Sequence, residues 1–335
     1  MNTRRNRLGG WIYPASLAIL LAGCSPTPER KPHATREAPA VRTTAAELES
    51  VTKAAKPYRL TLVVKTRNNP FFDPMIKAAE LEAQKVGATL EVQAPPQEGD
   101  KELQFSMVEN LTAKGVDAIL IAPADSRGIV PALQRAEAKG VLVINLDNRI
   151  DAQAAAETGL KLGGYVGADN EEGGRLAGRA MLGYLGGHGE VAILEGIRGA
   201  DNAEARKRGF ESAAAAGLDI VARESAEWDT QKGYAKFQSI LAAHRNLKGV
   251  FCANDKMALG AMKAIEEAGK RGVTVIGYDN IPEIKSYLKS GEMKATIEQH
   301  PDLMGRYGVL MAVGVLNGDV PKGREFLVPL EVVTE

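Results

Sequence analysis

The sequence predicts an α/β protein made of two doubly wound parallel-sheet lobes. From residue 58 onward, short β-branched apolar runs alternate with longer amphipathic runs. Such alternation produces parallel strands joined by right-handed helical crossovers. About ten strands are expected, which is many for one sheet, and the glycine-rich stretch 159–167 divides the series. We therefore expect two lobes rather than one.

The expected strands are short, nearly continuous apolar runs, such as AILIA at 118–122 and VLVINL at 141–146. Runs without polar alternation are typical of strands covered by helices on both faces. In chain order, the expected strands occupy residues 60–64, 89–92, 118–122, 141–146, 165–167, 190–194, 219–222, 249–252, 273–277 and 295–297.

The expected helices lie between these strands, and several of them end in glycine, within the segments KVG, AKG, AAG and EAG. A glycine at this place adopts the left-handed conformation that ends a helix and turns the chain back. In chain order, the expected helices occupy residues 74–86, 101–113, 128–138, 173–185, 203–216, 232–242, 256–268 and 283–290.

Residues 1–24 have the pattern of an export signal. Three arginines precede a short apolar core at 11–21, and LAGC ends at Cys24. This core is shorter than the ~18–20 apolar residues that span a bilayer. LAGC resembles the lipobox of bacterial lipoproteins, so we expect a lipid on Cys24 that anchors the protein to a membrane of the cell envelope or periplasm. An ordinary secretory peptide with an incidental Cys24 is the alternative.

Residues 25–56 are expected to form a disordered tether, because prolines and mixed charges dominate them and leave little apolar area to offset the entropy of folding. A fraying helix is the alternative for residues 45–56.

Composition excludes several classes of protein. The chain has 42 basic and 42 acidic side chains, whereas nucleic-acid binders need a basic surplus. Its two cysteines, Cys24 and Cys252, allow neither a disulfide framework nor a four-thiolate zinc site. The four histidines show no metal-ligand spacing, so we expect no metal and no cofactor.

Hydrogen-bonding side chains follow most of the expected strands, where ligands of open α/β sheets bind. They include Asp147-Asn148, Asn254 and Asp279, together with the aromatic residues Phe71 and Trp228. Singly, each has a structural explanation, such as a helix cap or a core position. Together they suit a sugar, because amides, carboxylates and a guanidinium pair with vicinal hydroxyl groups while aromatic rings stack on C–H faces.

The chain carries, in this order, the motifs VVKTRNNPFF, IAPADS, NLDN, GADNEEGG, GIRGADNAEARKRGF, AEWDTQKG, VFCANDKMALGA, VIGYDNIPE and ATIEQHP. As a series they resemble the motifs of periplasmic sugar-binding proteins of the ribose/allose ABC-transporter family. The resemblance covers essentially residues 58–335, and its local wording is most similar to D-allose-binding proteins. It implies a type I periplasmic binding protein fold with a three-strand hinge. The N-terminal lobe would comprise residues 57–167 plus 300–328, and the C-terminal lobe residues 168–299 plus 329–335.

The resemblance also implies a site. Asn148 lies where allose-binding proteins usually have Glu and ribose-binding proteins Arg, so the identity of the sugar is left open. A monosaccharide would be captured by hinge closure and delivered to an ABC transporter permease. The implied sugar-binding residues are Lys65, Asn69, Phe71, Phe72, Asp147, Asn148, Arg206, Trp228, Asn254, Asp279 and Gln299.

An enzyme is disfavoured because the sequence has no Gly-x-Gly-x-x-Gly, Gly-x-Ser-x-Gly, phosphate-binding loop or His-Glu-x-x-His motif, and Cys252 fits a buried core position. A sugar-responsive repressor would carry a helix-turn-helix where the export signal lies. A periplasmic receptor for chemotaxis, which would contact a chemoreceptor, or for a sugar-like signal molecule remains the open alternative.

Overall fold

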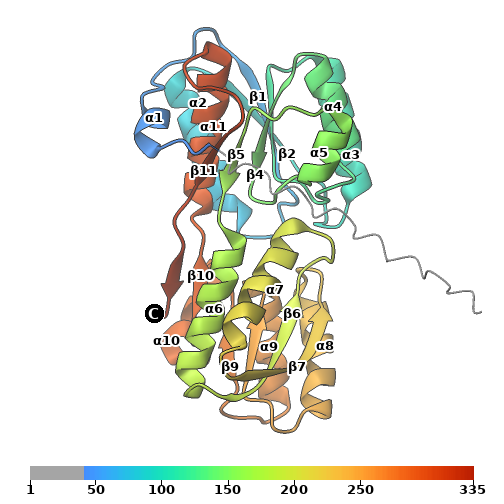
Figure 1. Ribbon diagram of the computed structural model, residues 1–335, viewed down its shortest axis with the longest axis vertical. Helices are drawn as coiled ribbons and strands as arrows, with labels where there is room; N and C mark the ends of the chain where they lie inside the picture. Colours follow the sequence, from blue (N-terminus) through green and yellow to red (C-terminus); the bar gives the residue numbers. More distant parts are fainter. Residues whose placement is uncertain (1–40) are drawn as a thin grey trace, which may run out of the picture. The chain divides into compact units, whose positions relative to one another are not determined.

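The computed structural model describes residues 41–335, which form two α/β lobes (Figure 1). The first lobe is built on a parallel sheet with the strand order β11-β5-β4-β3-β1-β2. Its strands are β1 (Arg59–Val63), β2 (Thr89–Gln93), β3 (Ala118–Ile121), β4 (Leu142–Leu146), β5 (Gly164–Gly167) and β11 (Arg324–Leu327).

The second lobe contains a parallel sheet with the order β7-β6-β8-β9. Its strands are β6 (Gly189–Glu195), β7 (Leu218–Ser225), β8 (Gly249–Cys252) and β9 (Thr274–Ile276). Beside it, β10 (Thr296–Glu298) pairs antiparallel with β12 (Glu331–Val333). A single bridge from Ile276 to Ala295 continues the larger sheet towards β10.

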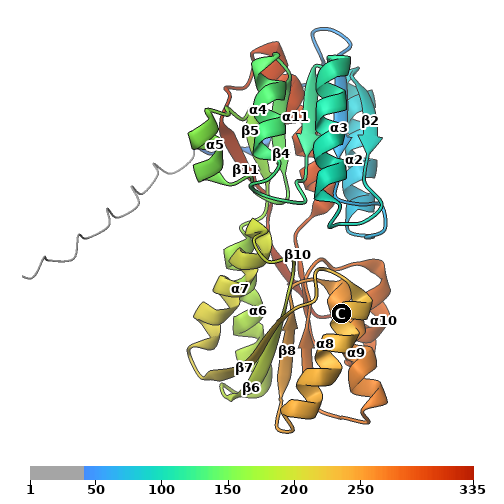
Figure 2. The ribbon, with the colours of Figure 1, turned by 90° about the vertical axis from the view of Figure 1, so that its right-hand side faces the viewer.

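Helices cover both faces of the first sheet (Figure 2). Along β3, Leu120 joins the cluster on the side of α2 and α11, whereas Ile119 and Ile121 join the cluster on the side of α3 and α4. Two-faced burial explains why this strand has no polar alternation. The helices of this lobe are α1 (Ala45–Glu49), α2 (Phe72–Val86), α3 (Lys101–Lys114), α4 (Val130–Ala138), α5 (Ala152–Thr158) and α11 (Pro301–Asn317).

In the second lobe, α6 packs along α7, and α8 packs along α9. The helices of this lobe are α6 (Asn170–Leu185), α7 (Asp201–Ala214), α8 (Thr230–Ala243), α9 (Asp255–Glu267), the short 3-10 helix η1 (Pro282–Ile284) and α10 (Lys285–Ser290).

The chain passes between the lobes three times, from β5 to α6, from β10 to α11, and from β11 to β12. These passages lie at residues 168–169, 299–300 and 328–330. The architecture is therefore that of a type I periplasmic binding protein, with both sheets ending towards the space between the lobes.

The expected tether is wrong for its last part, residues 41–56. These residues include α1, which begins with a capping box between Thr44 and Glu47. Leu48 is fully buried against the first lobe, and Val51 is 3% exposed. The burial of Leu48 and Val51 acts together with the capping box and the packing of α1 against α11 in ordering this segment. Residues 1–40, including the expected signal and Cys24, lie outside the described residues.

Four further elements were not expected: the short helix α5, the helix α11 and the strands β11 and β12. The helix α11 is buried along most of its length, so it lacks the polar face that marks a surface helix in a sequence. The strands β11 and β12 are short and flank loop residues, so their apolar signal is weak.

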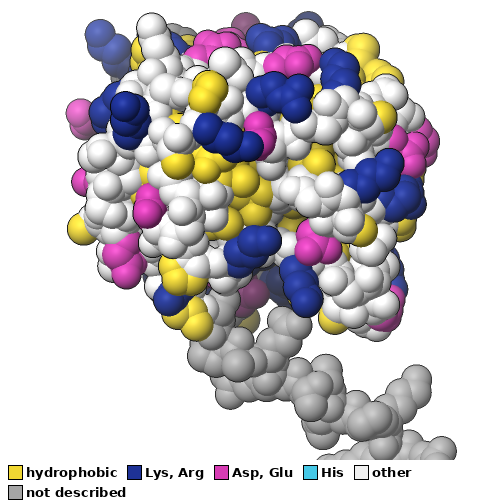
Figure 3. All heavy atoms as spheres, turned by 90° about the horizontal axis from the view of Figure 1, so that it is seen from above, with side chains coloured by type: hydrophobic (Ala, Val, Ile, Leu, Met, Phe, Trp, Pro, Cys, Tyr) yellow, Lys and Arg dark blue, Asp and Glu magenta, His cyan; other side chains and the backbone are white. Residues whose placement is uncertain are grey.

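The end of the first lobe that is remote from the second carries basic and acidic side chains side by side (Figure 3). Within residues 41–335, no helix has the length and apolar character needed to cross a membrane.

Candidate functional site: a polar cavity between the lobes

A cavity enclosing about 240 Å³ lies between the two lobes. Most of its lining follows the carboxyl ends of strands in both sheets, as expected for this fold. The lining residues are Lys65, Asn69, Phe71, Phe72, Glu98, Asp147, Asn202, Arg206, Trp228, Asn254, Asp279 and Gln299.

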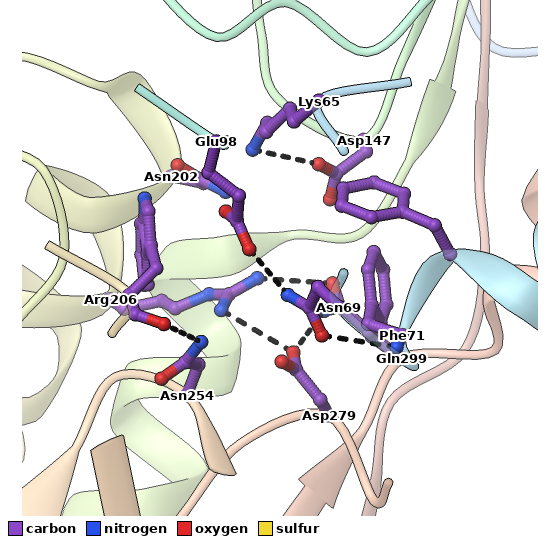
Figure 4. A pocket seen from close by; sticks show the side chains of 12 residues that line it. Lys65, Asn69, Phe71, Glu98, Asp147, Asn202, Arg206, Asn254, Asp279 and Gln299 are labelled. Carbon is purple, nitrogen blue, oxygen red and sulfur yellow. Dashed lines mark hydrogen bonds and ion pairs between the residues drawn. The ribbon is translucent and has the colours of Figure 1, made fainter. Parts of the chain in front are cut away.

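On the side of the first lobe, Lys65 and Asp147 form a buried ion pair. Lys65 follows β1 and Asp147 follows β4. The Nζ of Lys65 lies 3.0 Å from Asp147 Oδ2 (Figure 4). The two residues are 4% and 2% exposed. Each charge is compensated by the other, which a buried ion requires.

On the opposite side in Figure 4, Arg206 of α7 organises the second lobe's groups. Its Nη2 donates to Gln299 Oε1 at 3.2 Å, and its Nη1 lies 3.6 Å from Asp279 Oδ1. Gln299 Nε2 in turn donates to Asp279 Oδ1 at 2.7 Å. The guanidinium also lies over the ring of Tyr278, 3.6 Å from its centroid. A planar cation with five donors is suited to this fixed arrangement.

Two carboxylates of the cavity have altered acidity. Burial raises the pKa of Asp279 well above its usual range, against the opposing charge of Arg206. Burial likewise raises the pKa of Glu98, although Lys65 and the amide of Asn69 favour its ionised form. Glu98 lies in the loop after β2 and lines the cavity. Asn69 Nδ2 donates a hydrogen bond to Glu98 Oε1 at 2.7 Å.

Aromatic rings supply the apolar part of the lining. Phe71 and Phe72, at the start of α2, meet edge to face with centroids 5.0 Å apart. Trp228 follows β7 and is 4% exposed. Its ring lies against Gly196, where any side chain would collide with it. Glycine at the end of β6 is therefore needed to make room for Trp228.

Three lining residues have a positive φ, which is uncommon for residues other than glycine, although Asp and Asn adopt it more often than most. They are Asp147 (φ 56°), Trp228 (φ 65°) and Asp279 (φ 119°). Their conformations are held by the surrounding structure: Tyr165 OH donates to Asp147 O at 2.8 Å, and Asp279 N donates to Ile297 O at 2.8 Å. Strained backbone of this kind persists where it places a functional side chain.

Two buried oxygens of the lining, Asp147 Oδ1 and Asn202 Oδ1, have no hydrogen-bond partner within the described part of the chain. A buried acceptor without a donor costs about 1–3 kcal/mol. Both oxygens belong to residues that line the cavity, so hydroxyl or amine donors of a bound molecule would satisfy them. Among residues 41–335, no cluster of His, Cys, Asp and Glu is suited to hold a metal ion.

The structure brings all the expected site residues except Asn148 together around the cavity. The expectation that Asn148 contacts the sugar is therefore corrected. Asn148 does not line the cavity. Its amide turns away, donating to Pro123 O at 2.9 Å and to Ser126 Oγ at 3.1 Å. The adjacent Asp147, whose φ is 56°, lines the cavity instead. Asn254 has two roles, since it lines the cavity and also caps α9 by accepting from Met257 N.

Glu98 and Asn202 line the cavity but were not expected there. Glu98 lies five residues beyond β2, too far from a strand end for that criterion to find it. Asn202 lies four residues before Arg206 on α7. Residues at this spacing share one helix face, so the position of Arg206 contained the signal.

These features are those of a two-lobed solute-binding protein, and comparison with known proteins gives the family. Residues 60–319 match the periplasmic binding protein domain, and the chain belongs to that family.

Among its relatives is a D-ribose/D-allose-binding protein of Pseudomonas aeruginosa, 38% identical over 82% of this chain and 88% of the relative. Another is the ribose import binding protein RbsB of Bacillus subtilis, 37% identical over 78% of this chain and 83% of the relative. A solved solute-binding protein of an ABC transporter from Actinobacillus succinogenes, with bound D-allose, superimposes with a TM-score of 0.78. It is 40% identical and covers 82% of this chain and 97% of its own.

Proposed function

We propose that this protein captures one monosaccharide, an allose-like hexose or a ribose-like pentose, and delivers it to the permease of an ABC importer. The protein would act by binding and not by catalysis. The sugar would occupy the cavity between the lobes and would contact both of them only when they close. Closure would then follow from the difference in sugar affinity between the two states.

The observation that carries this proposal is the paired chemistry of the lining. Ionised groups, planar amides and a guanidinium surround the cavity, while Phe71, Phe72 and Trp228 contribute apolar faces. A sugar hydroxyl both donates and accepts, so it can donate to Asp147 Oδ1 while it accepts from a neighbouring donor. Relatives with the names of ribose and allose binders support the same class of ligand.

The test is calorimetric titration of the purified protein with allose, ribose, xylose, psicose and galactose. We expect one or two of these sugars to bind tightly and their epimers to bind more weakly. Each mismatched hydroxyl would leave a buried group unpaired and cost about 1–3 kcal/mol, or ~5- to 150-fold in affinity. The bound sugar should be recovered chemically unchanged. A protein that binds no monosaccharide at all would overturn the proposal.

Anchoring and delivery require separate tests. We propose that Cys24 carries a lipid, which would hold the folded lobes near the membrane. Cells that express the full chain should place it in the detergent phase after phase separation, and Cys24→Ser should move it to the aqueous phase. Recovery of both forms in the same phase would contradict the anchor. Delivery predicts that deletion of the partner permease abolishes uptake of the sugar that binds in calorimetry.

A further inference from the structure

Helix α7 begins without a cap of its own. Ala200 occupies its N-cap position and provides no side-chain hydrogen bond. The neighbouring helices α6, α8 and α9 are capped by Asp169, Asp229 and Asn254 of their own lobe. The difference matters because α7 carries Asn202 and Arg206, both of which line the cavity.

The missing cap is supplied by the opposite lobe. Ser126 Oγ accepts a hydrogen bond from Asp201 N at 3.0 Å, and Asn148 Oδ1 accepts one from Asn202 N at 3.0 Å. These are the first two amides of the helix, which otherwise have no partner within it. The residues Ser126 and Asn148 are 4% and 0% exposed.

The two capping side chains form one rigid unit. Asn148 Nδ2 donates to Ser126 Oγ and to Pro123 O, and Asn145 Nδ2 donates to Asn148 O at 2.8 Å. All of these groups belong to the first lobe, so their positions do not depend on the second. Their acceptor atoms are directed at the start of α7.

We propose that Ser126 and Asn148 are positioning residues for sugar capture, which cap α7 from the opposite lobe when the lobes close. This proposal rests on the proposed function and deepens it. Neither residue lines the cavity. Their hydrogen bonds favour the closed arrangement whatever sugar is present. They also fix the start of α7, the helix from which Asn202 and Arg206 reach the ligand.

A change in the closed population alters the apparent affinity for every ligand by the same factor. Loss of one helix cap lowers the equilibrium constant for the capped arrangement by about 2- to 30-fold. We therefore expect Asn148→Ala and Ser126→Ala to weaken binding of the tightest and the weaker sugars by an equal factor in this range. Asn148→Asp keeps an acceptor for Asn202 N and should retain more affinity than Asn148→Ala.

Hydrogen exchange measured by mass spectrometry on the full chain tests the cap directly, with and without sugar. The peptide 200–206 should exchange faster in Asn148→Ala and Ser126→Ala than in the wild type. The peptide 229–236 is the matched control, because Asp229 caps α8 from its own lobe, and its exchange should not change.

Three results would overturn the proposal. One is loss of affinity for a single sugar in Asn148→Ala with the others unchanged, which would make Asn148 a direct sugar ligand. Another is unchanged affinity for all sugars in both alanine variants. The third is unchanged exchange at 200–206. A wild-type protein that binds no monosaccharide would instead overturn the proposed function, while the exchange measurement would still decide the interlobe cap.

Discussion

At the scale of single residues, the cavity depends on charges that are buried in pairs. Lys65 and Asp147 follow two strands of the same sheet in the first lobe, and Lys65 Nζ lies 3.0 Å from Asp147 Oδ2. Water is excluded from them when side chains of the other lobe complete the cavity. Removing one partner would therefore oppose closure more strongly than removing both charges.

Lys65→Met should weaken sugar binding by roughly 10²- to 5 × 10³-fold, because closure would bury the uncompensated carboxylate of Asp147 at a cost of about 3–5 kcal/mol. The double variant Lys65→Met/Asp147→Asn should bind more tightly than the single variant, since it buries no unpaired charge. Calorimetric titration measures both. A double variant weaker than the single one would show that hydrogen bonds to the sugar outweigh the charge balance.

Gly196→Ala should displace the ring of Trp228, because the added methyl group would overlap it. Overpacking of this kind costs about 1–3 kcal/mol, and we expect a comparable loss in sugar binding together with a change in tryptophan fluorescence. The control is Gly183→Ala, at an exposed helical position with open space around it. The control should bind normally and be slightly more stable. Normal binding by Gly196→Ala would remove Trp228 from the sugar-binding surface.

At the scale of elements, short segments hold the lobes and the passages between them in place. Helix α1 has only five residues, too few to be stable alone, and it is fixed by the burial of Leu48 and by the hydrogen bond from Tyr307 OH to Glu49 Oε1 at 2.9 Å. It thereby attaches the start of the described chain to α11.

Leu48→Ala should lower the free energy of unfolding by about 2–5 kcal/mol, the usual cost of truncating a fully buried leucine. Sugar affinity should stay unchanged, because Leu48 does not line the cavity. Leu81→Ala is the matched control, since Leu81 is 59% exposed and its truncation should change stability by less than about 0.5 kcal/mol. Equal urea unfolding midpoints for the two variants would contradict the packing of α1.

The loop after β9 is held by Asp255 at the start of α9. Its carboxylate accepts from Tyr278 N at 2.9 Å, from Ile281 N at 3.1 Å and from Thr296 Oγ1 at 2.9 Å. These bonds fix the loop that carries Asp279 next to β10. These hydrogen bonds lower the pKa of Asp255, but the effect of burial is larger and raises the pKa to about 7.

The folded protein therefore keeps a proton on Asp255 that the unfolded chain releases near pH 4. Stability falls with rising pH wherever the folded state binds more protons, so this residue should lower the free energy of unfolding between about pH 4 and pH 7. In urea unfolding, the wild type should lose stability relative to Asp255→Asn across this range, because the variant cannot titrate there. Parallel pH profiles would show that the hydrogen bonds keep the carboxylate ionised.

At the scale of the whole molecule, the site exists only where the two lobes meet. The cavity takes lining residues from both lobes and from the passage that contains Gln299. Further contacts cross the gap, including the hydrogen bond from Lys256 Nζ to Asn68 O at 3.2 Å. A sugar in the cavity would therefore stabilise the assembly of the lobes and not one lobe alone.

A tightly binding sugar at 100 times its Kd should raise the free energy of unfolding by about 2.7 kcal/mol. Unfolding followed by far-ultraviolet circular dichroism should show one transition at the higher stability. Asn254→Ala should need a higher sugar concentration for the same shift, because it removes an amide from the cavity. A sugar that binds in calorimetry but leaves the unfolding transition in place would contradict binding to the folded, closed protein.

The local pattern of apolar residues was sufficient to predict the alternation of strands and helices, because burial on one or two faces leaves such a pattern. It also placed most of the site, since residues such as Lys65, Asp147 and Asp279 directly follow strands whose ends converge. The resemblance of its motifs to those of sugar-binding proteins agrees with the family match. Local patterns were sufficient wherever function is tied to a strand end.

Other features depend on contacts that form only when the chain has folded. The order of residues 41–56 depends on Leu48 finding a partner far along the chain, and the burial of α11 removes the polar face by which helices are recognised. Asp147 and Asn148 are neighbours in sequence, yet Asp147 lines the cavity while Asn148 accepts a hydrogen bond from α7 of the opposite lobe. Contacts between distant segments leave no periodic signal in a sequence, because each partner satisfies the other only after the chain has folded.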